Sequence, residues 1–105
     1  MTVANREEAI NIVRQLLREK LIACANIVGS VNSLYWWKGK IEESREFLVL
    51  MKTRENFFEK LAQRVKELHS YEVPEVIALP LVKGLPAYLS WLNACLKSTE
   101  SSTYS

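Results

Sequence analysis

Few side chains in this sequence could bind a metal ion or act as a nucleophile. The 105-residue chain has one histidine, His69, and two cysteines, Cys24 and Cys95. A thiolate and an imidazole together favour copper or zinc over magnesium or calcium. A closed structural zinc site needs four ligands, and the sequence contains no C-x-x-C pair. Any metal site must therefore be sparse, open to solvent or shared between subunits, which fits weak or transient binding.

The sequence offers little from which to build an enzyme. Its only glycines are Gly29, Gly39 and Gly84, so it has no glycine-rich phosphate loop. It has no G-x-S-x-G elbow, and a single histidine leaves little for a hydrolytic triad. Cys24 and His69 could pair as nucleophile and base, but a cysteine in an apolar strand is a poor nucleophile unless its surroundings favour the thiolate. We therefore expect no enzymatic activity.

Each candidate residue also has a plain structural explanation. Cys24 lies between Ala23 and Ala25, and a lone cysteine in an apolar strand is more often a small buried hydrophobe. His69 falls where a predicted helix ends, and a histidine there can cap the last carbonyl groups and favour the helix dipole. Glu72 alone would be a surface carboxylate. At this point both interpretations stay open.

The composition is that of an ordinary soluble globular protein. Hydrophobic residues make up 49% and charged residues 25%, and the net charge is +2. The length allows one domain, which we assign to residues 1–97, followed by a polar and disordered tail over residues 98–105. Lys38 and Lys40 beside Tyr35–Trp37 form an aromatic and basic cluster of the kind that binds single-stranded nucleic acid. Because no wider basic surface accompanies it, we expect no nucleic-acid partner.

The sequence predicts neither a membrane span nor export. The longest apolar run, Val76–Val82, is interrupted by Pro80 and is too short to cross a bilayer. Residues 1–6 lack the apolar core of a secretory signal. Two cysteines far apart in sequence do not make a secreted disulfide framework. We expect reduced thiols, a cytoplasmic location and no membrane partner.

Apolar residues at helical spacing predict three helices. They cover residues 5–20, 54–68 and 86–96. Asn5 can cap the first helix, and Glu8 three residues on completes a capping-box-like pair. Thr53 is a natural N-cap for the second helix, and Pro86 suits the first turn of the third.

Between the first two helices the sequence predicts a long β-hairpin. Residues 23–37 and 41–52 are rich in β-forming side chains, and Lys38–Gly39 supplies a tight turn. Residues 29–32 mark a bend or bulge. At roughly 3.3 Å per residue the arms reach about 40 to 50 Å, which is more than a small domain can cover. The apolar tip at residues 34–37 therefore needs a partner, most simply another copy of the same chain.

The order of the predicted elements fixes a fold class. Residues 75–79 predict a final strand that Pro80 closes, and residues 1–4 look like the end of an earlier strand. The order is then strand, helix, strand, strand, helix, strand, with a C-terminal helix added. This is the α+β, ferredoxin-like βαββαβ (split βαβ) sandwich, here with an extended hairpin.

Four stretches of the chain resemble the CutA family of divalent-ion-tolerance proteins. They are EKLIACANIV at 19–28, YWWKGKI at 35–41, LMKT at 50–53 and HSYEVPEVIALP at 69–80. The resemblance runs from about Thr2 to Leu96, nearly the whole chain. It has two departures: relatives usually carry several more strand residues before Thr2, and many have proline where Ser70 stands.

The resemblance implies a ferredoxin-like homotrimer that binds divalent metal ions, Cu2+ above all. Zn2+ is the alternative that a thiolate and an imidazole also suit. It implies that Cys24, together with His69 and Glu72 of the 69–72 motif, supplies the metal site. A role in the response or tolerance to metal ions follows from the same resemblance.

The resemblance also implies a likeness to the trimeric PII signalling proteins. In that alternative the protein is a sensor or scaffold, and its small ligand lies in a cleft between subunits. In relatives these motifs line clefts between subunits, so the resemblance implies that Trp37, Lys52 and Tyr71 line this cleft. A lysine beside an aromatic wall can hold a small anion. The plain explanation is that the tryptophans are interface packing and that Lys52 is a solvated charge at a strand end.

Removing metal tests whether the ligands hold the fold together. Because the candidate ligands are too few for a structural site, we expect the protein to stay folded in strong chelator. Far-UV circular dichroism with and without excess EDTA measures this directly. Loss of the spectrum on chelation would show that metal binding and folding are coupled.

Overall fold

The computed structural model describes residues 1–96 of the chain. The predicted tail at residues 98–105 lies outside the described residues. The described part contains β1 (Thr2–Val3), α1 (Arg6–Arg18), β2 (Cys24–Trp37), β3 (Lys40–Lys52), a 3-10 turn η1 (Glu55–Phe57), α2 (Phe58–Leu68) and α3 (Pro86–Cys95). This α+β set of elements confirms the predicted fold class.

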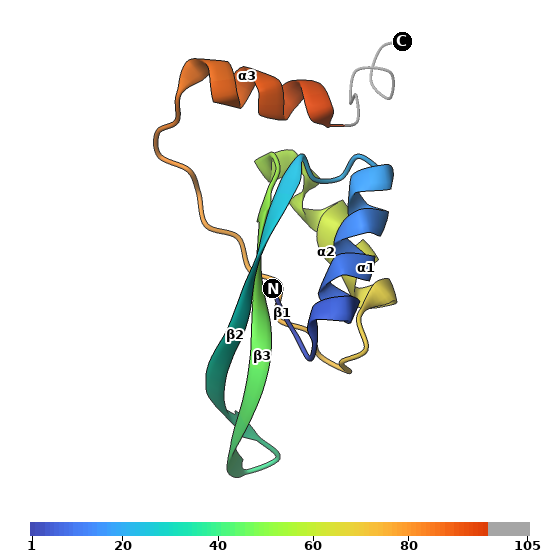
Figure 1. The fold of residues 1–105 in the computed structure, drawn as a ribbon, viewed down its shortest axis with the longest axis vertical. Helices are drawn as coiled ribbons and strands as arrows, with labels where there is room; N and C mark the ends of the chain where they lie inside the picture. Colours follow the sequence, from blue (N-terminus) through green and yellow to red (C-terminus); the bar gives the residue numbers. More distant parts are fainter. Residues whose placement is uncertain (97–105) are drawn as a thin grey trace.

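The fold is built on one antiparallel sheet with strand order β1-β3-β2. Cys24 lies opposite Lys52 at one end of the long hairpin, and Trp37 lies opposite Lys40 at the other. The short β1 pairs beside the middle of β3, with Thr2 opposite Leu48. Helices α1 and α2 lie together beside one half of the sheet, and the tip of the hairpin projects beyond them (Figure 1).

The core lies between this half of the sheet and the two helices. Val3 and Val49 from the sheet, Leu16 from α1 and Val65 from α2 are each at most 1% exposed. Ile22, just before β2, is also 1% exposed and belongs to the same cluster. Burying such aliphatic side chains stabilises the fold by roughly 1.5 to 3 kcal/mol each. Leu92 and Leu96 attach the C-terminal segment to this core.

The N-terminus of α1 is capped as predicted, but the capping box is not formed. Asn5 Oδ1 accepts a hydrogen bond from the Glu8 backbone N–H at 2.8 Å. The Glu8 carboxylate reaches the loop after α2, where it accepts from the Ser70 backbone N–H at 2.9 Å and from Ser70 Oγ at 3.0 Å. The prediction for the Glu8 side chain was wrong because a partner distant in sequence lies in reach.

The second helix was correctly located, but its predicted cap was wrong. The chain first makes the 3-10 turn η1, and α2 begins at Phe58 with no side-chain cap. Thr53 Oγ1 instead donates to the Leu21 carbonyl at 2.8 Å. This bond joins the end of β3 to the segment that leads into β2.

The hairpin carries both irregularities that the sequence predicted. Lys38 and Gly39 form the turn with φ angles of 51° and 78°, as expected of a two-residue hairpin turn whose twist matches the strands. The register shifts between Val28 and Val31, which places a bulge at residues 29–30. A Cβ atom at Gly29 would lie 2.5 Å from Cε2 of Phe47, so the Phe47 ring occupies the space that a side chain would need.

The predicted strand at residues 75–79 is not formed. From His69 to Leu85 the described chain has neither helix nor strand. A fourth ferredoxin-like strand would lie beside β1, which is only two residues long and offers too few backbone partners for a ladder. As a result Ile77 and Leu79 are 69% and 84% exposed in the single chain.

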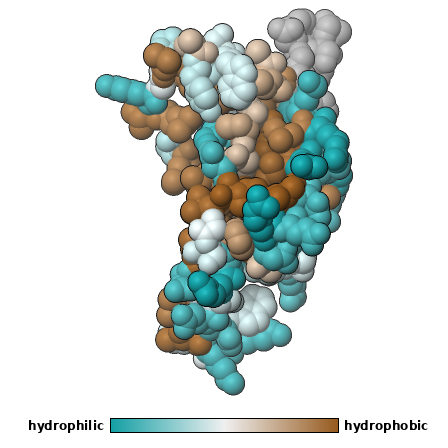
Figure 2. Space-filling view, in the orientation of Figure 1, coloured by the Kyte–Doolittle hydropathy of each residue, from teal (hydrophilic) through white to brown (hydrophobic). Residues whose placement is uncertain are grey.

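The hairpin tip also exposes large apolar side chains. Trp36 lies opposite Ile41, and these two residues are 72% and 64% exposed. Leu34, two residues before Trp36 and therefore on the same face of the hairpin, is 67% exposed. Figure 2 shows a hydrophobic patch at the lower end of the molecule, over this tip. A single chain thus leaves an apolar surface of the kind that monomers rarely expose.

Replacing Gly29 tests the packing at the bulge. We expect Gly29→Ala to lower the free energy of unfolding by about 1–3 kcal/mol, because the added methyl group overpacks the Phe47 ring. Urea unfolding at a fixed protein concentration measures the change. Ser30→Ala, at the exposed neighbouring position, is the matched control and should unfold like the wild type. Equal stability of Gly29→Ala and the wild type would contradict this account.

Candidate functional site

Cys24 is the first residue of β2, and its thiol is free and half-buried. Its Sγ lies 3.5 Å from the hydroxyl oxygen of Tyr88 on α3. The pKa of Tyr88 is raised, chiefly by this hydrogen bond to Cys24 and then by burial. The thiol is therefore not sealed in the core as a small hydrophobe, and it faces a polar group from a distant helix.

His69 follows the last residue of α2 as its C-cap, and its side chain is completely buried. Nε2 lies 2.7 Å from the Thr2 carbonyl oxygen, and Nδ1 lies 3.1 Å from the Tyr71 backbone nitrogen. A carbonyl only accepts and a backbone N–H only donates, so the imidazole is neutral with its proton on Nε2. The backbone N–H of His69, not the ring, bonds to the helix at the Val65 carbonyl. The ring thus joins the end of α2 to β1.

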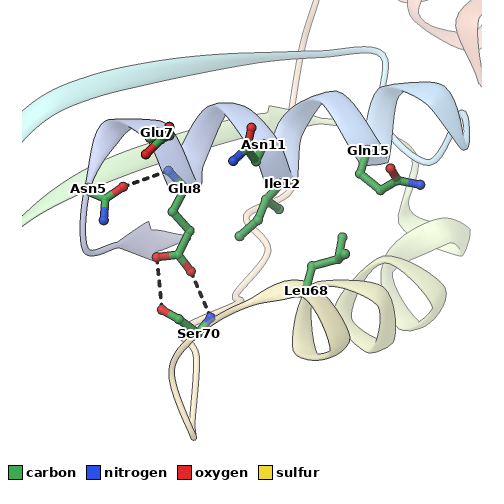
Figure 3. Close-up of a pocket in the computed structure, with 8 residues that line it drawn as sticks. All are labelled: Asn5, Glu7, Glu8, Asn11, Ile12, Gln15, Leu68 and Ser70. Carbon is green, nitrogen blue, oxygen red and sulfur yellow. Dashed lines mark hydrogen bonds between the residues drawn. The ribbon is translucent and has the colours of Figure 1, made fainter.

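Glu8 lies beside this histidine at the edge of a polar hollow. Its Oε2 is 3.5 Å from His69 Nδ1, and both carboxylate oxygens accept from Ser70. Figure 3 shows the hollow, between α1 and the end of α2, with Glu8 pointing across to Ser70. It measures about 420 Å³, and most of its lining is amide and carboxylate: Asn5, Glu7, Glu8, Asn11, Ile12, Gln15, Leu68 and Ser70.

Tyr71 binds a buried carboxylate. Its hydroxyl donates to Oε2 of Glu46 at 2.6 Å, and Glu46 is 5% exposed. Burial raises the pKa of Tyr71, and the hydrogen bond to Glu46 raises it further. The next residue, Glu72, is exposed. The 69–72 motif thus points two side chains inward and leaves one carboxylate in solvent.

The three predicted metal ligands do not come together within one chain. Cys24 is opposite Lys52, whereas His69 bonds to Thr2, which is opposite Leu48. These two positions on β3 are four residues apart, or roughly 13 Å along the strand. Among residues 1–96 no group of three or more His, Cys, Asp or Glu side chains could hold a metal ion.

The three predicted cleft residues are also separated in a single chain. Trp37 lies opposite Lys40 at the tip, beneath the Lys38 ammonium, which is 5.8 Å from the ring centre. Lys52 lies at the other end of β3, roughly 40 Å away along the strand, and donates a hydrogen bond to Asn26 Oδ1. Tyr71 is held by Glu46 between these ends.

Sequence reasoning missed three residues that contact the candidates: Glu8, Glu46 and Tyr88. Glu46 sits in a strand and Tyr88 in a helix, where nothing in the local pattern sets them apart. Each meets its partner 25 or more positions away in the chain, so only the fold reveals the contact.

Among the described residues, no helix has the length and hydrophobicity needed to cross a membrane.

Comparison with known proteins gives a consistent family match. Residues 1–95 match the family model described as CutA1 divalent ion tolerance protein. The divalent-cation tolerance protein CutA of Thermus thermophilus is 47% identical over 93 residues, which cover 89% of this chain and 90% of that protein. The chloroplastic CutA 1 protein of rice, Oryza sativa, is 46% identical over 93 residues. The chain spans 52% of the length of that rice protein.

Solved structures agree with the sequence match. The structure of the divalent cation tolerance protein from Thermus thermophilus superimposes with a TM-score of 0.88 at 45% identity, covering 91% of this chain and 93% of that one. The crystal structure of CutA1 from Oryza sativa gives a TM-score of 0.90 at 43% identity, covering 93% of this chain and 90% of that one. The sequence match and the shared fold lead to one conclusion: this chain belongs to the CutA1 divalent ion tolerance protein family.

Proposed function

We propose that this protein is a homotrimer that binds divalent metal ions, preferentially copper, and acts in the response or tolerance to them. The observation that carries the proposal is a free, half-buried thiol, Cys24, in a chain that matches a divalent-ion-tolerance family over residues 1–95. A thiolate is a soft ligand that selects copper and zinc.

Cys24 is the primary ligand in this proposal, and His69 and Glu72 complete the site. The His69 Nε2–H bond to a backbone carbonyl is the orientation that ligand histidines commonly adopt, and it leaves Nδ1 as the coordinating atom. Coordination requires that the Tyr71 N–H first release Nδ1. Since Cys24 and His69 are separated along the sheet of one chain, the site takes Cys24 from one subunit and His69 with Glu72 from another.

The trimer is supported by surfaces that a single chain leaves open. The outer edge of β2 pairs with no strand of the described chain, and the segment at residues 75–79 has no strand partner. Trp36, Ile41 and Leu79 are all more than 60% exposed. Pairing between copies would satisfy the backbone edge and cover these side chains together.

We also propose that the protein is not an enzyme and that it lies in the cytoplasm. The relatives compared above carry no enzyme's name. Both cysteines are free, which suits a reducing compartment. Compartments differ within the family: the rice relative is described as chloroplastic, and the Archaeoglobus fulgidus structure as that of a periplasmic protein.

A PII-like sensor or scaffold is the second candidate function, and the Tyr71–Glu46 pair favours it. A buried carboxylate held by a tyrosine hydroxyl gives the 69–72 motif a fixed polar wall. In a trimer, Trp37 and Lys52 of neighbouring copies would complete a cleft for a small ligand. A metabolite screen beside the metal titration separates the two functions.

The assembly is tested by molar mass. Light scattering at micromolar concentration should return three times the 12.1 kDa chain mass. Replacing Trp36 and Trp37 together by alanine should weaken the trimer strongly, by about 2 kcal/mol or more, because large aromatic side chains dominate interface energetics. Lys38→Ala, at the adjacent turn, is the control and should stay trimeric. A wild-type molar mass equal to that of one chain would refute the trimer.

The metal site is tested by calorimetry. Cys24→Ser should weaken copper binding at least tenfold and zinc binding less, because it removes the soft ligand. Affinity should also fall at mildly acidic pH, since thiol and imidazole bind metal only after losing a proton. Cys95→Ser is the matched control and should bind copper like the wild type.

Two further variants test the other two proposed ligands one at a time. Glu72→Gln changes an exposed side chain and should reduce copper affinity mildly. His69→Ala also removes the bonds to Thr2 and Tyr71, so its folding must be verified before its binding is compared. Unchanged copper binding in Cys24→Ser and in a folded His69→Ala would refute the metal role and leave the cleft sensor as the better account.

A further inference from the structure

The turn that follows α2 places a backbone N–H on a ring nitrogen of its own histidine. His69 Nδ1 accepts from the Tyr71 N–H at 3.1 Å, and Nε2 bonds to the Thr2 carbonyl at 2.7 Å. The His69 and Tyr71 rings lie 4.6 Å apart at an angle of 47°. Whether Nδ1 is occupied therefore depends on where the backbone of Tyr71 lies.

The far end of the Tyr71 side chain is anchored in the sheet. Its hydroxyl donates to Oε2 of Glu46 at 2.6 Å, and Glu46 is 5% exposed. Hydrogen bonds to a carboxylate are shorter and roughly twice as strong as those between neutral groups. Glu46 belongs to β3, which pairs with a strand on each side. The anchor is thus a strong bond to the central strand of the sheet.

A second carboxylate holds the same turn from the other side. Glu8 of α1 accepts from the backbone N–H and the hydroxyl of Ser70, at 2.9 and 3.0 Å, as Figure 3 shows. Residues 69–71 form neither helix nor strand, so these side-chain bonds fix the turn. Glu8 holds Ser70, whereas Glu46 holds Tyr71, the residue whose N–H occupies Nδ1 of His69.

These contacts are complete within one chain. The His69 side chain is 0% exposed, and Glu46 is nearly as buried. The side chains that the proposed trimer would cover, Trp36, Ile41 and Leu79, take no part in them. The arrangement of the turn therefore does not depend on which surface of a second copy covers the hairpin tip or residues 75–79.

We propose that Glu46 is a positioning residue for the 69–72 motif: its carboxylate holds the Tyr71 side chain and so keeps the Tyr71 N–H on His69 Nδ1. A ligand reaches Nδ1 only after this N–H has left. The apparent affinity of a metal ion that uses His69 is then reduced by the fraction of molecules in which Nδ1 is free. This consequence rests on the function proposed above, whereas the positioning itself does not.

Amide hydrogen exchange of the full-length protein without metal tests the anchor. Tyr71→Phe removes the hydroxyl and keeps the ring. We expect the residue-71 amide to exchange at least about tenfold faster, because a charge-assisted bond is lost. The Leu16 amide in the core of α1 should keep its rate. Tyr35→Phe is the matched control: it removes a hydroxyl that bonds to Ser44 Oγ on the hairpin and should leave residue 71 unchanged.

The histidine ring gives a second, independent measurement. His69 is the only histidine of the chain, so its ring 15N resonances are unambiguous. In Tyr71→Phe the Nδ1 resonance should shift as its N–H donor moves away. Nε2 should keep both its proton and its resonance, because its bond to Thr2 is untouched. A general loosening of the fold would instead disturb both nitrogens.

The outcomes separate the positioning role from the metal site. An unchanged exchange rate at residue 71, or an unchanged Nδ1 resonance, in folded Tyr71→Phe would overturn the proposal. Faster exchange at residue 71 and Leu16 alike would also overturn it, because global opening would then explain the rise. Glu46→Gln keeps the size and a neutral acceptor oxygen, so it should give a smaller change in both measurements. If Tyr71→Phe fails to fold, Glu46→Gln decides by the same criteria.

A copper titration by calorimetry adds the link to function. If His69 is a ligand, Tyr71→Phe should bind copper at least threefold more tightly than the wild type, because Nδ1 is released more easily. Unchanged copper affinity in a protein whose residue-71 amide exchanges faster would refute His69 as a ligand and leave the positioning role of Glu46 standing.

Discussion

The β2–β3 hairpin is longer than the helices can cover, and most features of the molecule follow from this mismatch. The core of Val3, Leu16, Val49 and Val65 occupies only the half of the sheet that lies beside α1 and α2. The other half carries Trp36 and Ile41 into solvent. An exposed hydrophobic surface of this kind is typical of an interaction site. The domain thus has one core and, as a single chain, leaves large apolar side chains exposed at the hairpin tip.

The same constraint shapes the candidate site. Strand pairing places Cys24 and the Thr2 partner of His69 at different positions along β3, so one chain does not bring these two proposed ligands together. Both ring nitrogens of His69 are hydrogen-bonded, to Thr2 and Tyr71, whereas within residues 1–96 the Cys24 thiol has one side-chain hydrogen bond, to Tyr88. In the proposed metal site the thiol is therefore the ligand within reach, and the histidine would have to be released from its two hydrogen bonds first.

Much of the fold was predictable because it depends on local chemistry. The helices follow from apolar spacing, the hairpin turn from Lys38–Gly39, the bulge from Gly29 and the first cap from Asn5. The failures all involve distant partners. Glu8 turns to Ser70 and Thr53 to Leu21, and residues 75–79 lack a neighbouring strand long enough to pair with.

The candidate site was less predictable for the same reason. The sequence singled out Cys24 and His69 by residue type, but not the groups that hold them. Tyr88 lies 64 positions from Cys24, and Thr2 lies 67 positions from His69.

We propose that copper binds at Cys24 in a site shared between subunits. Anomalous scattering from copper-soaked crystals of the assembled protein would locate the ion. We expect a copper peak within bonding distance of Cys24 Sγ, with His69 or Glu72 of a neighbouring subunit beside it. Crystals with no peak at Cys24 would refute this site.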